Sequence, residues 1–190
     1  MTRIVGGSAG GRRLAVPGGR DVRPTSDRAR EALFGTLGTL LDLAGARVLD
    51  LYAGTGAVGL EAVSRGAAHA LLVEADPRVA AAARANAAAL GLADRVQVAR
   101  DRVERALGTA PAEPYQLAFA DPPYRLPDAD VEQMLAALAP AGPTPGWLAR
   151  GAVVVVERPS RGPGPAWPAT LEPIRQRRYG EGTLWYGRRI

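Results

Sequence analysis

The chain has 190 residues, of which 47% are hydrophobic and 23% are charged, a composition that is typical of a folded globular protein and excludes a disordered one. It contains no cysteine and one histidine, which excludes disulfides, thiolate nucleophiles and metal sites built from cysteine or from two histidines. The formal net charge of +5 favours a polyanionic partner. Because no apolar run approaches membrane-spanning length and the basic start lacks the apolar core of a signal peptide, we expect a cytoplasmic protein with no membrane partner.

The first predicted element is a small hairpin or flexible flap in the basic N-terminal segment. Residues 3–5 and 13–16 alternate between basic and apolar types, and glycine pairs lie between them. Arginines supply phosphate contacts and glycines allow a nucleic-acid backbone to approach, although a basic tail with no specific target is the alternative. All 24 cationic residues are arginine, a bias that a GC-rich genome produces, so only the clustering of arginines at both ends of the chain carries weight.

Strands and helices alternate along the rest of the chain. A helix is predicted after Ser26 or Asp27, with an apolar stripe at helical spacing (Ala29, Leu33, Leu37, Leu40, Leu41). Strands are predicted at 47–51, 70–74, 96–99, 116–120 and 151–157, helices at 77–90, 102–107 and 128–138, and a hairpin at 170–179 and 183–187. This order predicts an α/β protein with a Rossmann-like, doubly wound, mostly parallel sheet that the last hairpin extends by an antiparallel strand.

The chain shows no internal repeat and no linker long enough to divide it. We therefore expect a single domain over residues 1–190, with residues 1–22 as a basic N-terminal extension and residues 23–190 as the core.

A glycine motif, Gly54-x-Gly56-x-x-Gly59, lies between the first buried strand and the next helix. Such glycines permit a tight turn and close approach of a ligand, and the motif also fits a dinucleotide-binding loop. Asp50 stands just before the glycines, where its charge would repel a pyrophosphate but suits a cationic ligand such as S-adenosylmethionine. Glu74, at the end of the next strand, is placed to accept hydrogen bonds from two ribose hydroxyls, a role that a nicotinamide nucleotide shares.

Acidic residues end four successive predicted strands. Asp101 follows the third strand, where it is placed to bind an adenine amino group, and Asp121 follows the fourth. For Asp50, Glu74 and Asp101 taken singly, helix capping is the alternative. Because ligands of open α/β sheets bind at the carboxyl ends of the strands, the four residues together predict one ligand site.

The stretch Asp121-Pro122-Pro123-Tyr124 follows a short apolar strand. The two prolines end the strand and stiffen the loop, because each fixes φ and neither has an N–H to donate. The loop presents a carboxylate, backbone carbonyls and an aromatic ring, which are the partners that a planar base with an exocyclic amino group needs. The alternative is that the prolines only end the strand and begin an ordinary loop, in which Tyr124 covers an apolar edge.

Together these motifs resemble those of class I S-adenosylmethionine-dependent methyltransferases, and more closely those of the bacterial small-subunit ribosomal RNA guanine-N2 methyltransferase family known as RsmD. The resemblance covers essentially the whole chain, and the arginine- and glycine-rich opening with the Arg-Pro-Thr and Asp-Arg that follow is its most particular part. The segments that carry it are 3–7, 11–14, 23–25, 27–28, 30–34, 50–62 and 121–124. The resemblance implies a seven-stranded sheet that ends in an antiparallel hairpin.

The resemblance also implies the cofactor and the roles of individual residues. The cofactor is S-adenosylmethionine, which leaves as S-adenosylhomocysteine, and no metal takes part. The implied cofactor residues are Thr25, Asp50, Tyr52, Ala53, Gly54, Gly56, Glu74, Ala75, Asp101, Arg102 and Asp121. The implied catalytic residues are Asp121, Pro122, Pro123 and Tyr124, and the expected RNA contacts are Arg3, Arg12, Arg13, Arg23 and Arg28.

The function implied by the resemblance is methyl transfer to the exocyclic N2 of a guanine in 16S ribosomal RNA. The target is expected within an assembled or assembling 30S subunit, and the protein is expected to act as a monomer in the cytoplasm. The same Asp-Pro-Pro-Tyr loop also serves adenine N6 in DNA or RNA, so that alternative stays open. A nicotinamide-dependent oxidoreductase would leave the Pro-Pro-Tyr loop unexplained, and the intact acidic residues argue against an idle RNA-binding module.

Overall fold

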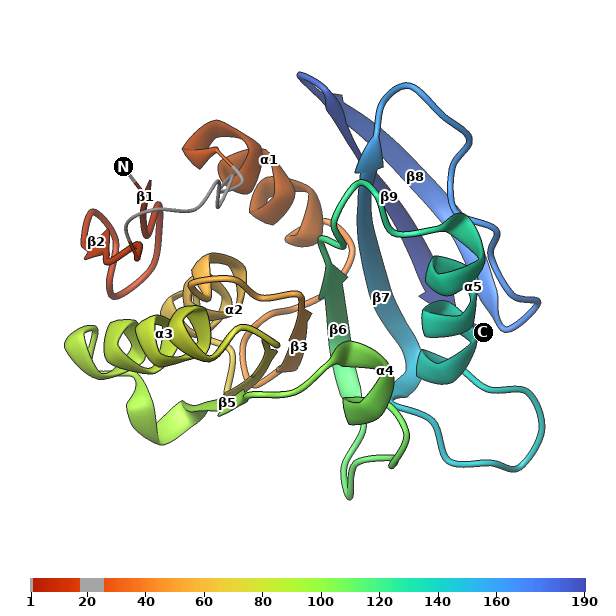
Figure 1. Cartoon of the computed structure of the whole chain (residues 1–190), viewed down its shortest axis with the longest axis horizontal. Coiled ribbons are helices and arrows are strands. Elements are labelled where there is room, and N and C mark those ends of the chain that lie inside the picture. The colour runs from red at the N-terminus through yellow and green to blue at the C-terminus, as the bar shows by residue number, and fades with distance from the viewer. Residues whose placement is uncertain (1, 18–25) are drawn as a thin grey trace.

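A seven-stranded sheet with the strand order β5-β4-β3-β6-β7-β9-β8 forms the centre of the computed structural model, which describes residues 2–17 and 26–190 (Figure 1). The strands are β3 (Arg47–Leu51), β4 (His69–Val73), β5 (Val96–Ala99), β6 (Tyr115–Ala120), β7 (Leu148–Pro159), β8 (Leu171–Tyr179) and β9 (Gly182–Arg189). The pairs among β3 to β7 are parallel, whereas β9 is antiparallel to both of its neighbours, β7 and β8. The predicted fold class is confirmed. Arg23 and Thr25, to which the sequence analysis assigns roles, lie outside the described residues.

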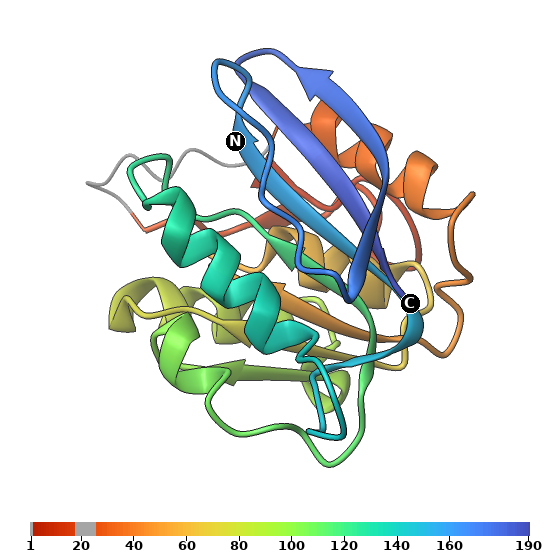
Figure 2. The same cartoon turned by 90° about the vertical axis from the view of Figure 1, so that its right-hand side faces the viewer.

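Helices cover both faces of this sheet. They are α1 (Asp27–Leu37), α2 (Ala57–Ser64), α3 (Pro77–Ala89), α4 (Val103–Ala106) and α5 (Asp128–Leu138), and a 3₁₀ turn, η1, spans Ala93–Arg95. Side chains alternate along the buried strands, so Val153 and Val155 pack with α1, α2 and α3, while Val154 and Val156 pack with α4 and α5. Figure 2 shows α1 and α5 on opposite sides of the last three strands. No helix in the described ranges is long and apolar enough to cross a membrane.

Helix α1 is shorter than the sequence pattern predicts. Ser26 caps it by accepting a hydrogen bond from the amide of Ala29 at 3.2 Å, and the helix ends at Leu37. The predicted stripe therefore loses Leu40 and Leu41, which lie past the helix end. The inner face of α1 also contains an arginine, Arg30, which is fully buried.

The basic N-terminal segment forms a docked hairpin rather than a flexible flap. Strands β1 (Thr2–Arg3) and β2 (Arg13–Leu14) pair antiparallel, and Ile4 beside them is fully buried. The amide of Val5 donates to the Glu61 carboxylate at 3.1 Å, and the amide of Ala9 donates to the Ser64 hydroxyl at 2.9 Å. Because Glu61 and Ser64 belong to α2, the hairpin is fixed to the helix that follows the glycine motif.

Candidate cofactor and base site

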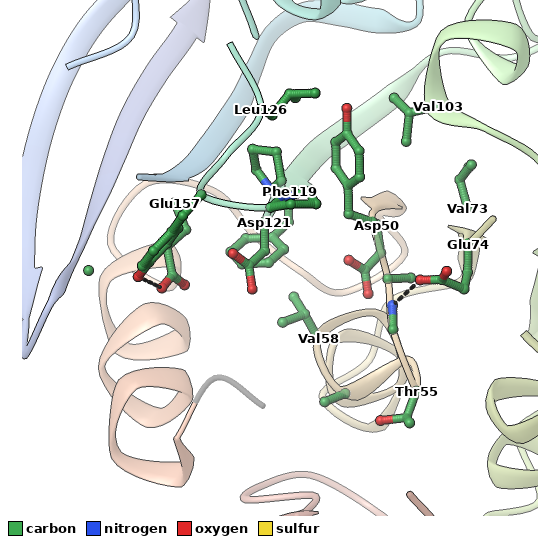
Figure 3. Close-up of a pocket in the computed structure, with 18 of the residues that line it drawn as sticks. Asp50, Thr55, Val58, Val73, Glu74, Val103, Phe119, Asp121, Leu126 and Glu157 are labelled. Carbon is green, nitrogen blue, oxygen red and sulfur yellow. Dashed lines mark hydrogen bonds between the residues drawn. The ribbon is translucent and has the colours of Figure 1, made fainter. Parts of the chain in front are cut away.

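A cavity of about 1450 Å³ opens at the carboxyl edge of the sheet (Figure 3). Its walls come from the loops after β3, β4, β5 and β6, the end of β7 and the turn between β8 and β9. The glycine loop after Asp50 and the corner 121–124 therefore line the same cavity. Pockets for single small molecules usually measure about 300–1,000 Å³, so this cavity has room for a cofactor and a base together.

The first wall of the cavity is the turn between β3 and α2. Tyr52 has a left-handed backbone with φ of 57°, a conformation that is rare for non-glycine residues and concentrates at functional sites. Gly54 and Gly56 follow with φ of 57° and 86°. A Cβ on Gly56 would lie 2.6 Å from Leu72 Cδ2, so the turn requires glycine there for space as well as for its dihedral angles.

Asp50 lies at the floor of this turn and is 2% exposed. Its Oδ2 accepts a hydrogen bond of 2.8 Å from the amide of Gly59. Burial raises the pKa of Asp50 to about 7, an effect that the Gly59 hydrogen bond opposes and the nearby Glu74 carboxylate reinforces. A cation bound in the cavity would favour the charged form of this carboxylate.

Glu74 and Asp101 also lie at strand ends along the cavity, and both already bind backbone groups. Glu74 accepts the amide of Gly54 at 2.9 Å and the amide of Asp76 at 2.7 Å, which ties the end of β4 to the glycine loop. Asp101 accepts the amide of Arg102 at 2.8 Å and forms an ion pair of 3.2 Å with Arg105. Each carboxylate therefore binds the backbone of its own loop and also lines the cavity. Backbone capping and ligand binding, which the sequence analysis gave as alternatives, are thus compatible for Glu74 and Asp101.

The proline corner forms the opposite wall. Leu51 pairs with Ala120, and the amide of Asp121 then donates to the Leu51 carbonyl at 3.4 Å, so Asp121 lies directly beside the end of β3. Pro122 is buried, whereas the Tyr124 side chain is 39% exposed at the cavity mouth. Asp121 and Tyr124 belong to one rigid loop, and that loop faces the glycine turn across the cavity.

Glu157 is a cavity residue that the sequence analysis did not single out. Ala120 pairs with Val156 in the parallel register, so Glu157 is the counterpart of Asp121 on the neighbouring strand β7. Figure 3 shows both carboxylates pointing into the cavity, and the Tyr124 hydroxyl donates to Glu157 Oε1 at 3.4 Å. The signal was present, because Glu157 follows four valines at a strand end in the same way that Asp121 follows β6.

The β8–β9 turn closes the cavity beside Glu157, and this wall was also missed. A Cβ on Gly182 would lie 2.6 Å from Glu157 Oε1 and 3.1 Å from the Tyr124 hydroxyl oxygen. The hairpin backbone therefore packs directly against these two side chains. Its contribution follows from the order of the sheet, in which β9 pairs with β7, and not from any local motif.

The structure separates the arginines that were expected to contact RNA. Arg28 is exposed and lines the cavity. Arg3 forms an ion pair of 2.8 Å with Asp27, and Arg12 donates to the carbonyl of Ala89, so both bind other parts of the chain. Arg13 is exposed on β2.

The chemistry of the cavity fits S-adenosylmethionine. Three carboxylates, those of Asp50, Glu74 and Asp101, follow one another along the edge, where a cation, ribose hydroxyls and an amino group each need an acceptor. Apolar side chains lie between them and offer surfaces to a planar ring; they include Val58, Val73, Val103 and Phe119. Within 2–17 and 26–190 no group of three or more acidic or histidine side chains is arranged to hold a metal ion.

Known proteins resemble this chain over nearly its full length. A family described as "Conserved hypothetical protein 95" matches residues 2–188. Ribosomal RNA small subunit methyltransferase D of Escherichia coli K12 is 36% identical over 179 residues, which cover 94% of this chain and 85% of that protein. YlbH of Bacillus subtilis, described as a candidate rRNA methyltransferase, is 38% identical over 138 residues, 72% of this chain and 71% of its own. The solved structure of yhhF from Escherichia coli, described as a candidate methyltransferase, matches with a TM-score of 0.83 at 36% identity and covers 98% of this chain and 97% of that one.

Proposed function

The chain belongs to the RsmD family of class I S-adenosylmethionine-dependent methyltransferases, and from that premise we propose that it methylates the exocyclic N2 of a guanine in 16S ribosomal RNA. The observation that carries the proposal is the shared cavity, in which the glycine turn after Asp50 faces the corner formed by Asp121 and Tyr124. A methyl donor held at the first wall and a base held at the second would meet inside this cavity.

The proposed chemistry depends on how the chain positions an amine. The cofactor, when bound, supplies a methyl group made electrophilic by its sulfonium. The carboxylate of Asp121 and the carbonyl of Pro122 accept hydrogen bonds from the two N–H groups of the target amine, so that its lone pair points away from the corner. As the amine nitrogen bonds to the methyl carbon, the carbon–sulfur bond breaks, and the surplus proton on nitrogen passes to the Asp121 carboxylate or to water. Tyr124 stacks on the base, and Asp50 holds negative charge on the cofactor side. Positioning and preorganised electrostatics supply most of the acceleration in such a site.

Glu157 supports guanine over adenine as the target base. The Watson–Crick edge of guanine carries adjacent N–H donors at N1 and N2, and two neighbouring carboxylates, Asp121 and Glu157, provide acceptors for them. Adenine presents an acceptor at N1, which a carboxylate would repel. The Tyr124 hydroxyl contacts this second acceptor at 3.4 Å.

We also propose the setting in which the enzyme works. The chain acts in the cytoplasm as a monomer and as one domain over residues 1–190, with residues 1–22 as its basic extension. Its target guanine is presented by an assembled or assembling 30S subunit. The arginine-rich composition and the net charge of +5 support a ribosomal RNA partner.

The test is to incubate the purified protein and isotopically labelled S-adenosylmethionine with 30S particles, naked 16S rRNA or DNA. The RNA is taken from a strain that lacks its own methyltransferase of this family. Digestion to nucleosides followed by mass spectrometry is expected to show N2-methylguanosine at one position, with 30S particles as the best substrate. Labelled N6-methyladenosine would replace the proposal by its adenine alternative, and absence of label from all three substrates would refute it.

A further inference from the structure

A second groove lies between α1 and the edge strand β8, outside the cavity that holds the cofactor and base sites. It measures about 500 Å³ and is lined by Gly35 and Thr36 of α1, by Thr39 just past the end of that helix, and by Arg175, Arg177 and Arg178 of β8. We call it the α1–β8 groove. Both cartoon views place α1 beside the β8–β9 hairpin (Figures 1 and 2). None of the described residues that line this groove is acidic.

The α1–β8 groove continues into the cavity. Arg178 and Tyr179 line both, and the turn 180–182 that follows them forms part of the cavity wall. A polymer that leaves the cavity past this turn therefore enters the groove. The groove is in the right place to hold the part of a substrate adjacent to the reacting base.

The side chains of Arg175 and Arg177 are exposed in the groove, whereas Arg178 donates to the Gly180 carbonyl at 3.4 Å. In the described part of the chain no carboxylate lies within ion-pair distance of Arg175 or Arg177. Both face the α1 side of the hairpin, where burial raises the pKa of Tyr186 to about 12 while the charges of Arg177 and Arg175 act to lower it. The strand thus presents uncompensated positive charge toward the groove.

We propose that the α1–β8 groove binds the sugar–phosphate backbone of the single-stranded ribosomal RNA next to the methylated nucleotide. This inference rests on the proposed function. A base that enters a catalytic pocket must be unstacked, so its neighbours run as an extended strand away from the pocket. Arg175 and Arg177 are two residues apart on β8, about 6.8 Å along the strand, and can therefore contact successive phosphates of that strand. The planar fork of arginine suits bidentate phosphate binding.

An edge strand also carries charge to prevent pairing with another chain, and this role makes a different prediction. If the arginines of β8 serve only that purpose, their removal promotes self-association and leaves RNA binding unchanged. Size-exclusion elution of each variant separates this outcome from a loss of RNA contacts.

The experiment compares the double variant Arg175→Ala/Arg177→Ala with a matched control, Arg95→Ala/Arg150→Ala. The control removes the same net charge from exposed arginines near the amino ends of β5 and β7, at the opposite edge of the sheet. Binding of a fluorescent, mixed-sequence, 20-nucleotide single-stranded RNA is measured between 50 and 300 mM salt. Because each phosphate contact on a single strand contributes about 0.7 to the slope of log affinity against log salt, the groove variant should lose about 1.4 in slope.

A second readout uses 30S particles and the methyl-transfer reaction. In the groove variant kcat/KM should fall by roughly tenfold or more while kcat and S-adenosylmethionine affinity stay within about twofold, and Arg175→Lys/Arg177→Lys should restore most of the slope. Equal slopes in the groove variant and the wild type would overturn the proposal, as would an equal loss in the control pair. Weakened binding to anionic vesicles with unchanged RNA binding would overturn it in favour of a lipid surface. If the wild type binds RNA but methylates none, the proposed function fails. The slope of log affinity against log salt still shows whether the α1–β8 groove contacts RNA phosphates.

Discussion

The amide of Gly59 donates a hydrogen bond of 2.8 Å to the buried carboxylate of Asp50, and this contact joins the end of β3 to the first turn of α2. The contact needs glycine, because a Cβ at residue 59 would lie 3.2 Å from Asp50 Oδ2 and 2.8 Å from Leu72 Cδ1. The hydrogen bond alone does not offset the burial of Asp50, since the pKa of this carboxyl still rises to about 7. The free protein thus holds an acid whose charge is costly until a cation arrives.

Replacement of Asp50 by asparagine should stabilise the free protein at alkaline pH. The pKa of Asp50 rises from the ordinary 3.8 of an aspartate to about 7 on folding, so the folded chain retains a proton that the unfolded chain releases in that window. The contribution of Asp50 to the free energy of unfolding therefore falls as the pH rises from about 4 to about 7 and is constant above pH 7. Asparagine does not titrate, so the Asp50→Asn variant does not lose stability in this way. As the pH rises from 5 to 8, the stability advantage of the variant over the wild type in urea unfolding should grow by about 3 kcal/mol.

The same variant should bind the cofactor more weakly, which separates the two roles of Asp50. Calorimetric titration with S-adenosylmethionine at pH 8 should show an affinity loss of roughly tenfold or more, because a charge that faces the bound cation is gone. The asparagine oxygen still accepts the Gly59 amide, so the turn keeps its shape. A variant that is stabilised but binds the cofactor as well as the wild type would show that Asp50 does not face the cation.

Removal of the Asp121 carboxylate should separate catalysis from cofactor binding. In Asp121→Ala the target amine loses an acceptor, and kcat should fall by roughly 100- to 1,000-fold or below detection, as when a preorganised hydrogen-bonding group is deleted elsewhere. Binding of S-adenosylhomocysteine, measured by calorimetry, should stay within about threefold, because the glycine turn and Glu74 are untouched. Loss of cofactor affinity with full turnover would reverse the assigned roles.

Glu157 should set the choice between bases. When the target guanine is replaced by 2-aminopurine, the amine at N2 remains but N1 becomes an acceptor that the Glu157 carboxylate repels. In Glu157→Gln the carboxamide can donate to that acceptor, so the rate ratio of guanine to 2-aminopurine should fall by roughly tenfold or more, within the range of one base-reading hydrogen-bond pair.

The control for the base-choice experiment is Tyr124→Phe, which removes the hydroxyl bonded to Glu157 at 3.4 Å and keeps the stacking ring. Its ratio should change by less than about threefold, because the carboxylate stays in place. An unchanged ratio in Glu157→Gln would mean that the carboxylate lies away from the N1 edge.

The sequence predicts those parts of the molecule that depend on local chemistry. Alternating strands and helices and the glycine turn after Asp50 could both be predicted, because each depends on residues close together in the chain. Glu157 and the Gly182 wall were missed because they reach the cavity through the pairing of β7 with β6 and β9, which no local pattern specifies. Arg30 was missed for a related reason, since its partner Glu61 lies on another helix.

The buried pair of Arg30 and Glu61 should be the costliest interaction to break outside the cavity. Both side chains are fully buried, their Nε and Oε2 atoms are 3.6 Å apart, and Glu61 also accepts the amide of Val5 from the N-terminal hairpin. Burial lowers the pKa of Arg30, and the carboxylates of Glu61 and Asp27 oppose that effect. Glu61→Gln leaves the fully buried Arg30 with only the carboxylate of Asp27, a partly exposed residue 2.7 Å away. Because Arg30 then keeps a buried charge with half of its compensation removed, the variant should lower the free energy of unfolding by about 3 kcal/mol.

Arg65→Ala is the matched comparison, since Arg65 contacts the same carboxylate at 2.8 Å but from a partly exposed position. It should cost less than Glu61→Gln, because the Arg65 guanidinium is partly in water and the buried Glu61 carboxylate keeps its contact with Arg30. Urea unfolding gives both values, and hydrogen exchange at the Gly11 amide, which donates to the Ile4 carbonyl at 2.8 Å, reports whether the hairpin opens first. In Glu61→Gln that amide should exchange faster than amides of β3 and β6, because one of the contacts that hold the hairpin on α2 is weakened while the sheet keeps its own bonds. The prediction would be contradicted if the two variants lowered the free energy of unfolding equally and the exchange rate of the Gly11 amide did not change. Burial would then not make the Arg30–Glu61 contact more stabilising than the Arg65–Glu61 contact.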